Sequence, residues 1–144
     1  MWDTIATEAE RQSPLWGDAL LPATERETEP VFSTLASDRY ALGLETIYEG
    51  YLVHYGRSRL FRARDDAVAL LLGDYLYAHG LVRIAELGEV EAIEALSALI
   101  AECAHLRAEG APGDGDLWAS TALGLGGGTD ERERALAAHS RRVG

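Results

Sequence analysis

The side chains that could do chemistry in this sequence are few and lie far apart. A zinc site needs His, Cys or carboxylate ligands that converge, yet no two of the four histidines share a helical turn. Asp65 and Asp66 are adjacent, so on a helix their side chains would point about 100° apart. That pair suits a helix start better than a magnesium clamp. Cys103 lies on a predicted apolar face and is expected to fill the core. We therefore predict no catalytic, cofactor-binding or metal-binding residue.

A stripe of aromatic residues is the first candidate for binding. Tyr48, Tyr51, Leu52 and Tyr55 recur at helical spacing on one face of a predicted helix. Tyrosine combines a large apolar body with a polar tip and is enriched at interfaces. Three interpretations stay open for this stripe: ordinary core packing, a surface that faces a partner, or the wall of an apolar tunnel.

An arginine run is the second candidate. The sequence RSRLFRAR at 57–64 contains Arg57, Arg59, Arg62 and Arg64. Such a run is usually a solvated turn between helices. In an acidic protein it is also a candidate positive patch for a diphosphate or for an acidic partner. The glycine-rich GLGGGT at 124–129, in contrast, lacks the Lys-Ser/Thr of a phosphate loop and is predicted to separate two helices.

The elements that must position these residues are all predicted to be helices. Strand-like alternation is absent, no proline occurs between residues 31 and 111, and good helix formers dominate. The stretch 65–87 is apolar nearly all round, so it is predicted to be the buried centre of a bundle. Helices are expected at 3–12 (with Asp3 as N-cap), 31–56 (ending at Gly56), 65–87 (ending at Gly88), 89–109, 117–125 and 130–142. Irregular segments are expected at 13–30, 57–64 and 110–116.

Composition sets the remaining bounds. The chain has 144 residues, and its hydrophobic content of 47% predicts a globular protein. Its formal net charge of −11 predicts that it does not bind nucleic acid. We divide it into an N-terminal segment, 1–30, and a single helical domain, 31–144. All thirteen basic residues are arginine, which excludes Schiff-base lysine chemistry. A single cysteine, no apolar run near the length of about 18 residues needed to span a membrane, and no signal-peptide pattern favour a cytoplasmic protein.

Residues 41–87 resemble the trans-polyprenyl diphosphate synthase family. The sequence ALGLETIYEGYLVH, which ends at His54, is similar to the helix that precedes the family's first aspartate-rich motif. AVALLLGDYLYAHGL at 67–81 is similar to a buried helix of the same enzymes, and 117–144 resembles the helix pair that follows. The resemblance implies an all-α, isoprenoid-synthase-like bundle in truncated form.

The chain departs from the family where the family keeps its chemistry. HYGRSR stands where HDDxxD is expected, and the stretch between His54 and Gly73 is shorter than in the enzymes. The second aspartate-rich motif is absent, and the family's lysine is replaced in GDGDLW. Since these motifs hold the magnesium ions that draw charge off the leaving diphosphate, the chain is not expected to ionise a diphosphate by itself.

Two functional hypotheses follow from the resemblance. The first is a non-catalytic small subunit of a heteromeric polyprenyl diphosphate synthase, which completes the dimer and influences product length. Its partner would be the catalytic large subunit, which would also supply any magnesium, and a polyprenyl diphosphate product tail is a second candidate contact. The alternative is a stand-alone homodimer that binds an apolar isoprenoid ligand. An enzyme of another type ranks last because no acid–base pair converges.

Overall fold

The computed structural model describes residues 1–128 and 130–144, and within them it contains helices and no strand. Thr129, the last residue of the predicted GLGGGT break, lies outside the described residues. The prediction of an all-α helical bundle is confirmed. The helices are α1 (Trp2–Gln12), α2 (Pro14–Ala19), α3 (Ala41–Tyr55), α4 (Asp66–Ala85), α5 (Val90–Glu109), α6 (Asp114–Leu123) and α7 (Arg132–Val143). Short 3-10 turns occupy Ala23–Glu25, Ser33–Leu35 and Asp38–Tyr40.

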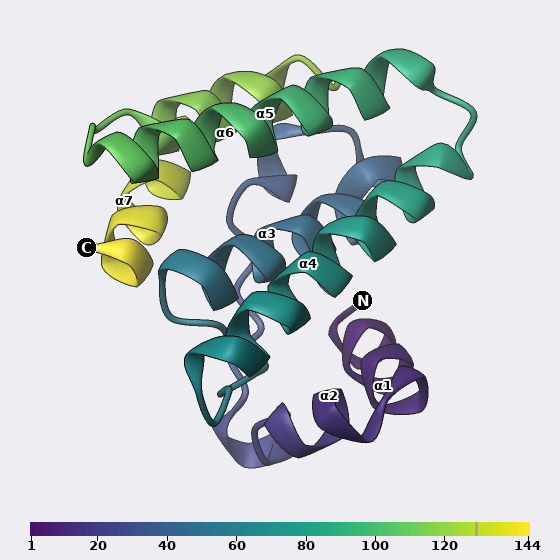
Figure 1. Ribbon diagram of the computed structural model, residues 1–144. Coiled ribbons are helices and arrows are strands. Elements are labelled where there is room, and N and C mark those ends of the chain that lie inside the picture. Colours follow the sequence, from purple (N-terminus) through teal and green to yellow (C-terminus); the bar gives the residue numbers. More distant parts are fainter. Residues whose placement is uncertain (129) are drawn as a thin grey trace.

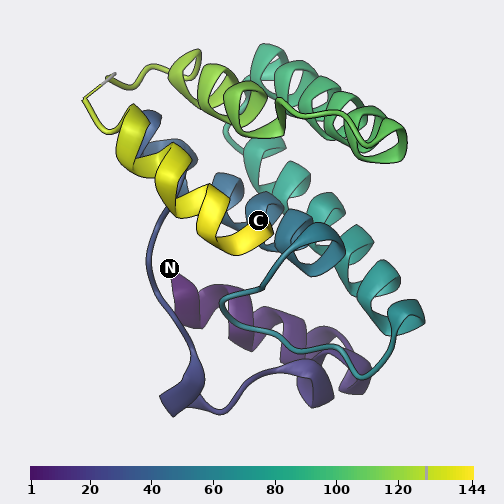
Figure 2. The ribbon, with the colours of Figure 1, turned by 90° about the vertical axis from the view of Figure 1, so that its left-hand side faces the viewer.

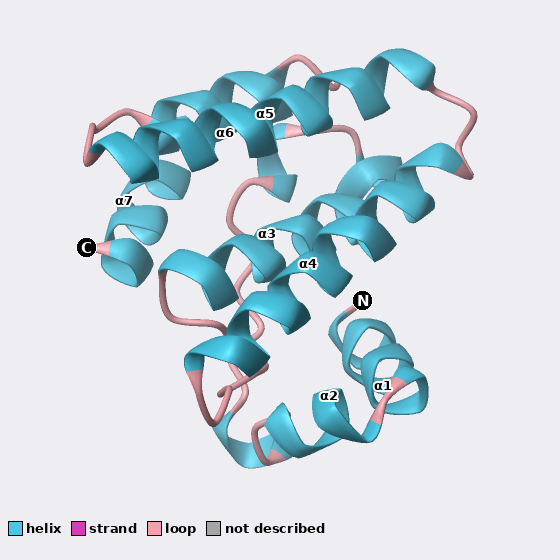
Figure 3. Cartoon of the chain, in the orientation of Figure 1, coloured by secondary structure: helices cyan, strands magenta, loops and turns pink. Residues whose placement is uncertain are grey.

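The helices form three levels around a central pair (Figures 1 and 3). The pair α3 and α4 crosses the middle of the molecule, α5 and α6 lie on one side of it, and α1 and α2 lie on the other. Figure 2 shows α7 lying against the side of this stack, close to α3. One hydrophobic cluster joins α3 to α5, α6 and α7, and a second joins α1 and α2 to α4 and to Leu60 and Phe61.

Glycine lets α3 and α4 approach closely in an antiparallel arrangement. A Cβ added at Gly80 of α4 would lie 2.4 Å from Cγ1 of Ile47 on α3 and 3.1 Å from the carbonyl oxygen of Gly43. Further along the same contact, a Cβ at Gly50 would lie 2.9 Å from the carbonyl oxygen of Gly73. A helix–helix contact this short excludes any larger side chain at these positions, so the register of the pair is fixed.

Several predicted boundaries are confirmed. Asp65 caps α4, since its Oδ1 accepts a hydrogen bond of 2.9 Å from the Val68 N–H. Gly56 follows α3, and Gly88, with φ of +77°, follows α4. The prediction of Asp3 as N-cap is wrong, because α1 begins at Trp2 and places Asp3 in its first turn. Residues 13–30 also contain a short helix, which Ser13 caps.

The predicted helix 31–56 begins ten residues late, at Ala41. The Glu45 carboxylate of α3 accepts hydrogen bonds from the backbone N–H groups of Val31 (3.0 Å) and Ser33 (3.2 Å), so this segment folds back against α3. The Ser37 N–H donates to the carbonyl of Leu125 instead of continuing a helix. A side-chain acceptor and a distant loop therefore replace the helical bonding that composition alone predicted.

The prediction that 65–87 is the buried centre of the bundle is also wrong. Helix α4 packs on α3 with one face and on α1 and α2 with another, but no helix of the described chain covers its third face. Leu70, Leu71 and Val82 on that face are 57%, 55% and 51% exposed. Figure 1 shows α4 running in front of α3, with none of the described helices in front of it.

Candidate functional site

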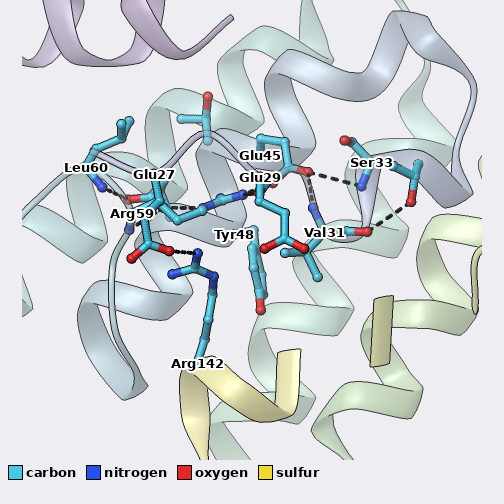
Figure 4. A network of polar contacts seen from close by, with 12 residues as sticks. Glu27, Glu29, Val31, Ser33, Glu45, Tyr48, Arg59, Leu60 and Arg142 are labelled. Atoms are coloured by element: carbon cyan, nitrogen blue, oxygen red, sulfur yellow. Dashed lines mark hydrogen bonds and ion pairs between the residues drawn. The ribbon is translucent and has the colours of Figure 1, made fainter. Parts of the chain in front are cut away.

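A buried cluster of charged side chains lies between α3 and the loop that follows it. Glu45 and Glu49 are one helical turn apart on the same face, and both are fully buried. Between them lies Arg59, whose Nη1 donates to Glu45 Oε1 and whose Nε donates to Glu49 Oε1, each over 2.7 Å. Figure 4 shows Glu45 and Arg59 of this cluster together with Glu29, Val31 and Ser33 of the segment that packs against it. Sequence reasoning assigned no role to either glutamate.

Arg59 is enclosed entirely by its own chain. Its Nη1 also donates to the Glu29 carbonyl over 2.8 Å, and its guanidinium lies 4.5 Å from the ring centre of Trp2 and 5.1 Å from that of Tyr48. Burial lowers the pKa of Arg59, but the charges of Glu45 and Glu49 outweigh burial and raise the pKa above its usual value. Arg59 is thus a charged core residue, and it is not available to an external anion as the sequence suggested.

The other three arginines of the run border an open pocket. Arg57, Arg62 and Arg64 line a cavity of about 420 Å³ together with Asp65 and Asp66. Arg57 pairs with Glu27 over 2.5 Å, and Arg64 lies 3.6 Å from Asp65. Within the described residues Arg62 forms no ion pair. Anion binding at this pocket stays a prediction, now limited to three of the four arginines.

The tyrosine stripe lies in the core. Tyr48, Tyr51 and Leu52 are buried, and Tyr55 is half-buried. The ring centres of Tyr48 and Tyr51 lie 5.1 and 5.7 Å from that of Trp118 on α6. Burial raises the pKa values of Tyr48 and Tyr51 above the usual range, so both phenols keep their protons. Core packing is what this chain shows for the stripe, and an interface or tunnel role for it stays a prediction.

A second polar cluster joins α3, α5, α6 and α7 at Asp114. Its Oδ2 accepts from Tyr51 Oη (2.6 Å), Arg107 Nη2 (2.6 Å) and His139 Nε2 (3.1 Å). Burial raises the pKa of Asp114, but the hydrogen bonds from His139, Tyr51 and Arg107 outweigh it, so the pKa lies well below its usual range. The other ring nitrogen of His139 lies 2.7 Å from Tyr48 Oη. No local sequence signal marks this cluster, because its members are scattered along the chain.

These clusters leave little for catalysis among the described residues. Each carboxylate in them is bound by arginine, hydroxyl or backbone donors, and no group of three or more His, Cys, Asp or Glu residues in the described part of the chain could hold a metal ion. Cys103 is buried as predicted, and burial raises the pKa of its thiol to about 12. The clusters therefore tie the helices together.

One surface is unusual for so acidic a protein. The side of α4 that no described helix covers, which we name the α4 face, consists of Ala67, Leu70, Leu71, Asp74, Ala78, Val82 and Ala85, all exposed. By length and composition α4 could span a membrane, since its most apolar 18-residue window has a mean hydropathy of 1.3, and a third of that window is buried. A single helix of this kind is weak evidence for a membrane span, because the core helix of a soluble protein can have the same length and composition, and α4 contains Asp74 and Arg83. The polar edge of α4 is tied to α1, because His79 and Arg83 each bind Glu8 over 2.6 Å.

Comparisons with protein-family models, with curated proteins and with solved structures found no match to this chain. The resemblance to polyprenyl diphosphate synthases consequently rests on the amino-acid sequence of residues 41–87 and 117–144 alone.

Proposed function

We propose that this protein is a non-catalytic accessory subunit that binds a partner protein through the α4 face. The observation that carries the proposal is the exposure of Leu70, Leu71 and Val82 along one side of the most apolar helix. Contiguous apolar patches on soluble proteins mark interaction sites, because water does not otherwise tolerate them at low cost. The carboxylates of the two polar clusters are bound by donors of the same chain, which supports a binding role over a catalytic one.

The sequence resemblance suggests the identity of the partner. The partner is a full-length polyprenyl diphosphate synthase that keeps both aspartate-rich motifs and supplies the magnesium chemistry. The accessory chain completes a heterodimer in the cytoplasm and influences the length of the product. Most of the α4 face lies within AVALLLGDYLYAHGL at 67–81, and GDYLYA in this stretch is the most specific part of the resemblance.

Co-expression with a full-length synthase from the same genome tests the proposal. The tagged chain should co-elute with the synthase, and the mixture should make a different distribution of product lengths from the synthase alone. Leu71→Glu should abolish co-elution, because it places a charge in the middle of the α4 face. Val90→Glu is the matched control, since Val90 is an equally exposed apolar residue at the start of α5. Identical products at identical rates, with and without the chain, would sink the proposal.

A stand-alone homodimer is the second candidate, and the pattern of residues on the α4 face favours it. If two α4 helices packed antiparallel about residue 76, Leu70 would oppose Val82 and Ala67 would oppose Ala85, which match in size, whereas Asp74 would oppose Ala78 and Leu71 would oppose Leu81 outside the α4 face. An apolar groove of about 530 Å³ between α5 and α6, lined by Leu106 and Leu117 among others, is the candidate place for an apolar ligand. Light scattering of the purified chain separates the two candidates, because a stable dimer without a synthase supports the second.

A further inference from the structure

Helix α7 is attached to the bundle mainly through charged groups. Arg142 Nη2 donates to Glu27 Oε2 over 2.5 Å, and its Nη1 donates to the carbonyl of Arg57 over 3.1 Å. The Arg57 N–H in turn donates to the Arg142 carbonyl over 3.0 Å. His139 lies between Tyr48 and Asp114, and Arg134 and Arg141 each lie 3.7 Å from Glu29. Basic side chains of α7 thus meet an acidic segment of the chain.

The apolar attachment of α7 is small by comparison. Its buried apolar residues are Ala135 and Ala138, and Leu136 and Val143 are only partly buried. Because the stabilisation from burial grows with the apolar area removed from water, two alanines stabilise the docked helix far less than the large side chains that hold α3 in place. A helix with few buried apolar contacts belongs to the low-stability end of a protein, which opens before the whole unfolds.

An aromatic surface lies directly beneath α7. The ring centre of His139 lies 5.4 Å from that of Phe32 and 5.7 Å from that of Tyr48, and Phe32 stacks on Trp118 at 5.5 Å. Trp118 Nε1 is buried and has no hydrogen-bond partner among the described residues. Departure of α7 would expose aromatic rings and an indole donor, a composition typical of the centres of protein interfaces.

The chain before α7 is anchored independently of it. Ala36 and Gly126 form an isolated bridge, and the Ser37 hydroxyl donates to the Gly126 carbonyl over 3.2 Å. A Cβ at Gly127 would lie 1.6 Å from the Leu35 carbonyl oxygen, so this part of the loop fits closely against the segment 35–37. α6 and its loop can therefore keep their places while α7 moves.

We infer that α7 is a displaceable latch, held by charge, that covers the aromatic surface of Phe32, Tyr48, Tyr51 and Trp118. It opens without unfolding of α3 to α6. This device is separate from the α4 face and does not depend on the identity of a partner there. Displacement of α7 would also make the tyrosine stripe accessible.

Hydrogen exchange on the unmodified protein tests the latch. Amides of α7 should exchange at least about tenfold faster than those of α3, because opening of α7 needs less free energy than global unfolding. Raising NaCl from about 50 mM to about 500 mM should increase the α7 rates and leave α3 unchanged, because salt screens the partly exposed pairs of α7. Equal protection of α7 and α3 at both salt concentrations would overturn the inference.

Two matched variants locate the contacts that close the latch. Arg142→Gln should accelerate α7 exchange by about tenfold or more, because it removes a charge-assisted bond to Glu27. Arg141→Gln should have a much smaller effect, since Arg141 is 62% exposed and its contact with Glu29 is longer, at 3.7 Å. In a Trp2→Phe, Trp16→Phe background, acrylamide should quench Trp118 more strongly at high salt. If Arg142→Gln does not fold, the salt series on the unmodified protein decides the question alone.

Discussion

The two helices at the centre of this protein differ in which kinds of side chain they bury and which they expose to water. Helix α3 buries two carboxylates, Glu45 and Glu49, whereas α4, packed tightly against it, exposes Leu70, Leu71 and Val82. Charge inside is tolerated because Arg59 and backbone N–H groups satisfy it. Apolar surface outside has no such compensation within the described chain. The contrast teaches that α3 is complete as folded, whereas the α4 face is the part of the molecule that lacks a neighbour.

The largest effect should come from removing the cation that makes α3 complete. Arg59→Met leaves Glu45 and Glu49 buried without their cation, so we expect a loss of about 3–5 kcal/mol in the free energy of unfolding. Urea denaturation followed by circular dichroism measures the loss. Arg62→Met is the control, because Arg62 is exposed and should change stability by about 0.5 kcal/mol or less. A loss below about 1 kcal/mol for Arg59→Met would mean that the buried carboxylates find other partners.

Acid should weaken the contacts between charged groups before it affects the apolar contacts. Burial alone would raise the pKa values of Asp114 and Glu27, whose ordinary values are 3.8 and 4.5. Hydrogen bonds from neighbouring side chains outweigh burial and lower both pKa values. A lowered native pKa contributes stability that is complete above about pH 5 and is lost as the pH falls towards the native value. Unfolding free energy should therefore decrease below about pH 5.

Asp114→Asn identifies the group responsible for that acid dependence. The variant should cost about 1–3 kcal/mol at neutral pH, because three donors lose a charged acceptor, and it should flatten the acid limb of the profile. Asp116→Asn is the control, since the Asp116 side chain is 71% exposed and, among the described residues, pairs only with Arg132, over 3.3 Å. An unchanged acid limb in Asp114→Asn would assign the dependence to other carboxylates.

The close contact between the two helices is the next target. Gly80→Ala places a Cβ against Ile47 and the Gly43 carbonyl, and overpacking of this kind costs about 1–3 kcal/mol. Alanine returns up to about 1 kcal/mol of helix propensity, so a net loss of about 1 kcal/mol is expected in thermal or urea unfolding. Gly128→Ala, where the added Cβ meets nothing within 4 Å, should be neutral. Equal effects of the two would show that α3 and α4 can shift apart.

The smallest effect on folding should come from the α4 face itself. Leu71→Gln should change the unfolding free energy by about 0.5 kcal/mol or less, because the side chain is already largely in water. The same variant should still weaken partner binding, as measured by co-elution. A loss of stability comparable to that of a core leucine would show that the α4 face is covered within the chain, and the contrast with α3 would then fail.

The sequence predicted the helical elements better than their surroundings. Asp65 and Gly56 marked real helix ends, because capping is a local property of the backbone, and Gly88 lies three residues beyond the end of α4. The burial of Glu45 and Glu49 could not be predicted, since their cation, Arg59, lies fourteen and ten residues away in a loop. The exposure of α4 could not be predicted either, because the sequence of an apolar helix does not specify how many of its faces other helices cover.

The contact between Arg142 and Glu27 has a consequence for the order in which the molecule assembles. It joins residues 115 positions apart, whereas α3 and α4 are consecutive helices joined by a short loop. Because contacts between near segments form faster, α3 and α4 should pair early, and during synthesis this can precede the emergence of α7 from the ribosome. Through that interval Phe32, Tyr48 and Trp118 lack their final cover. The nascent chain therefore passes through a stage in which this aromatic surface is uncovered, until α7 has been made and packs against it.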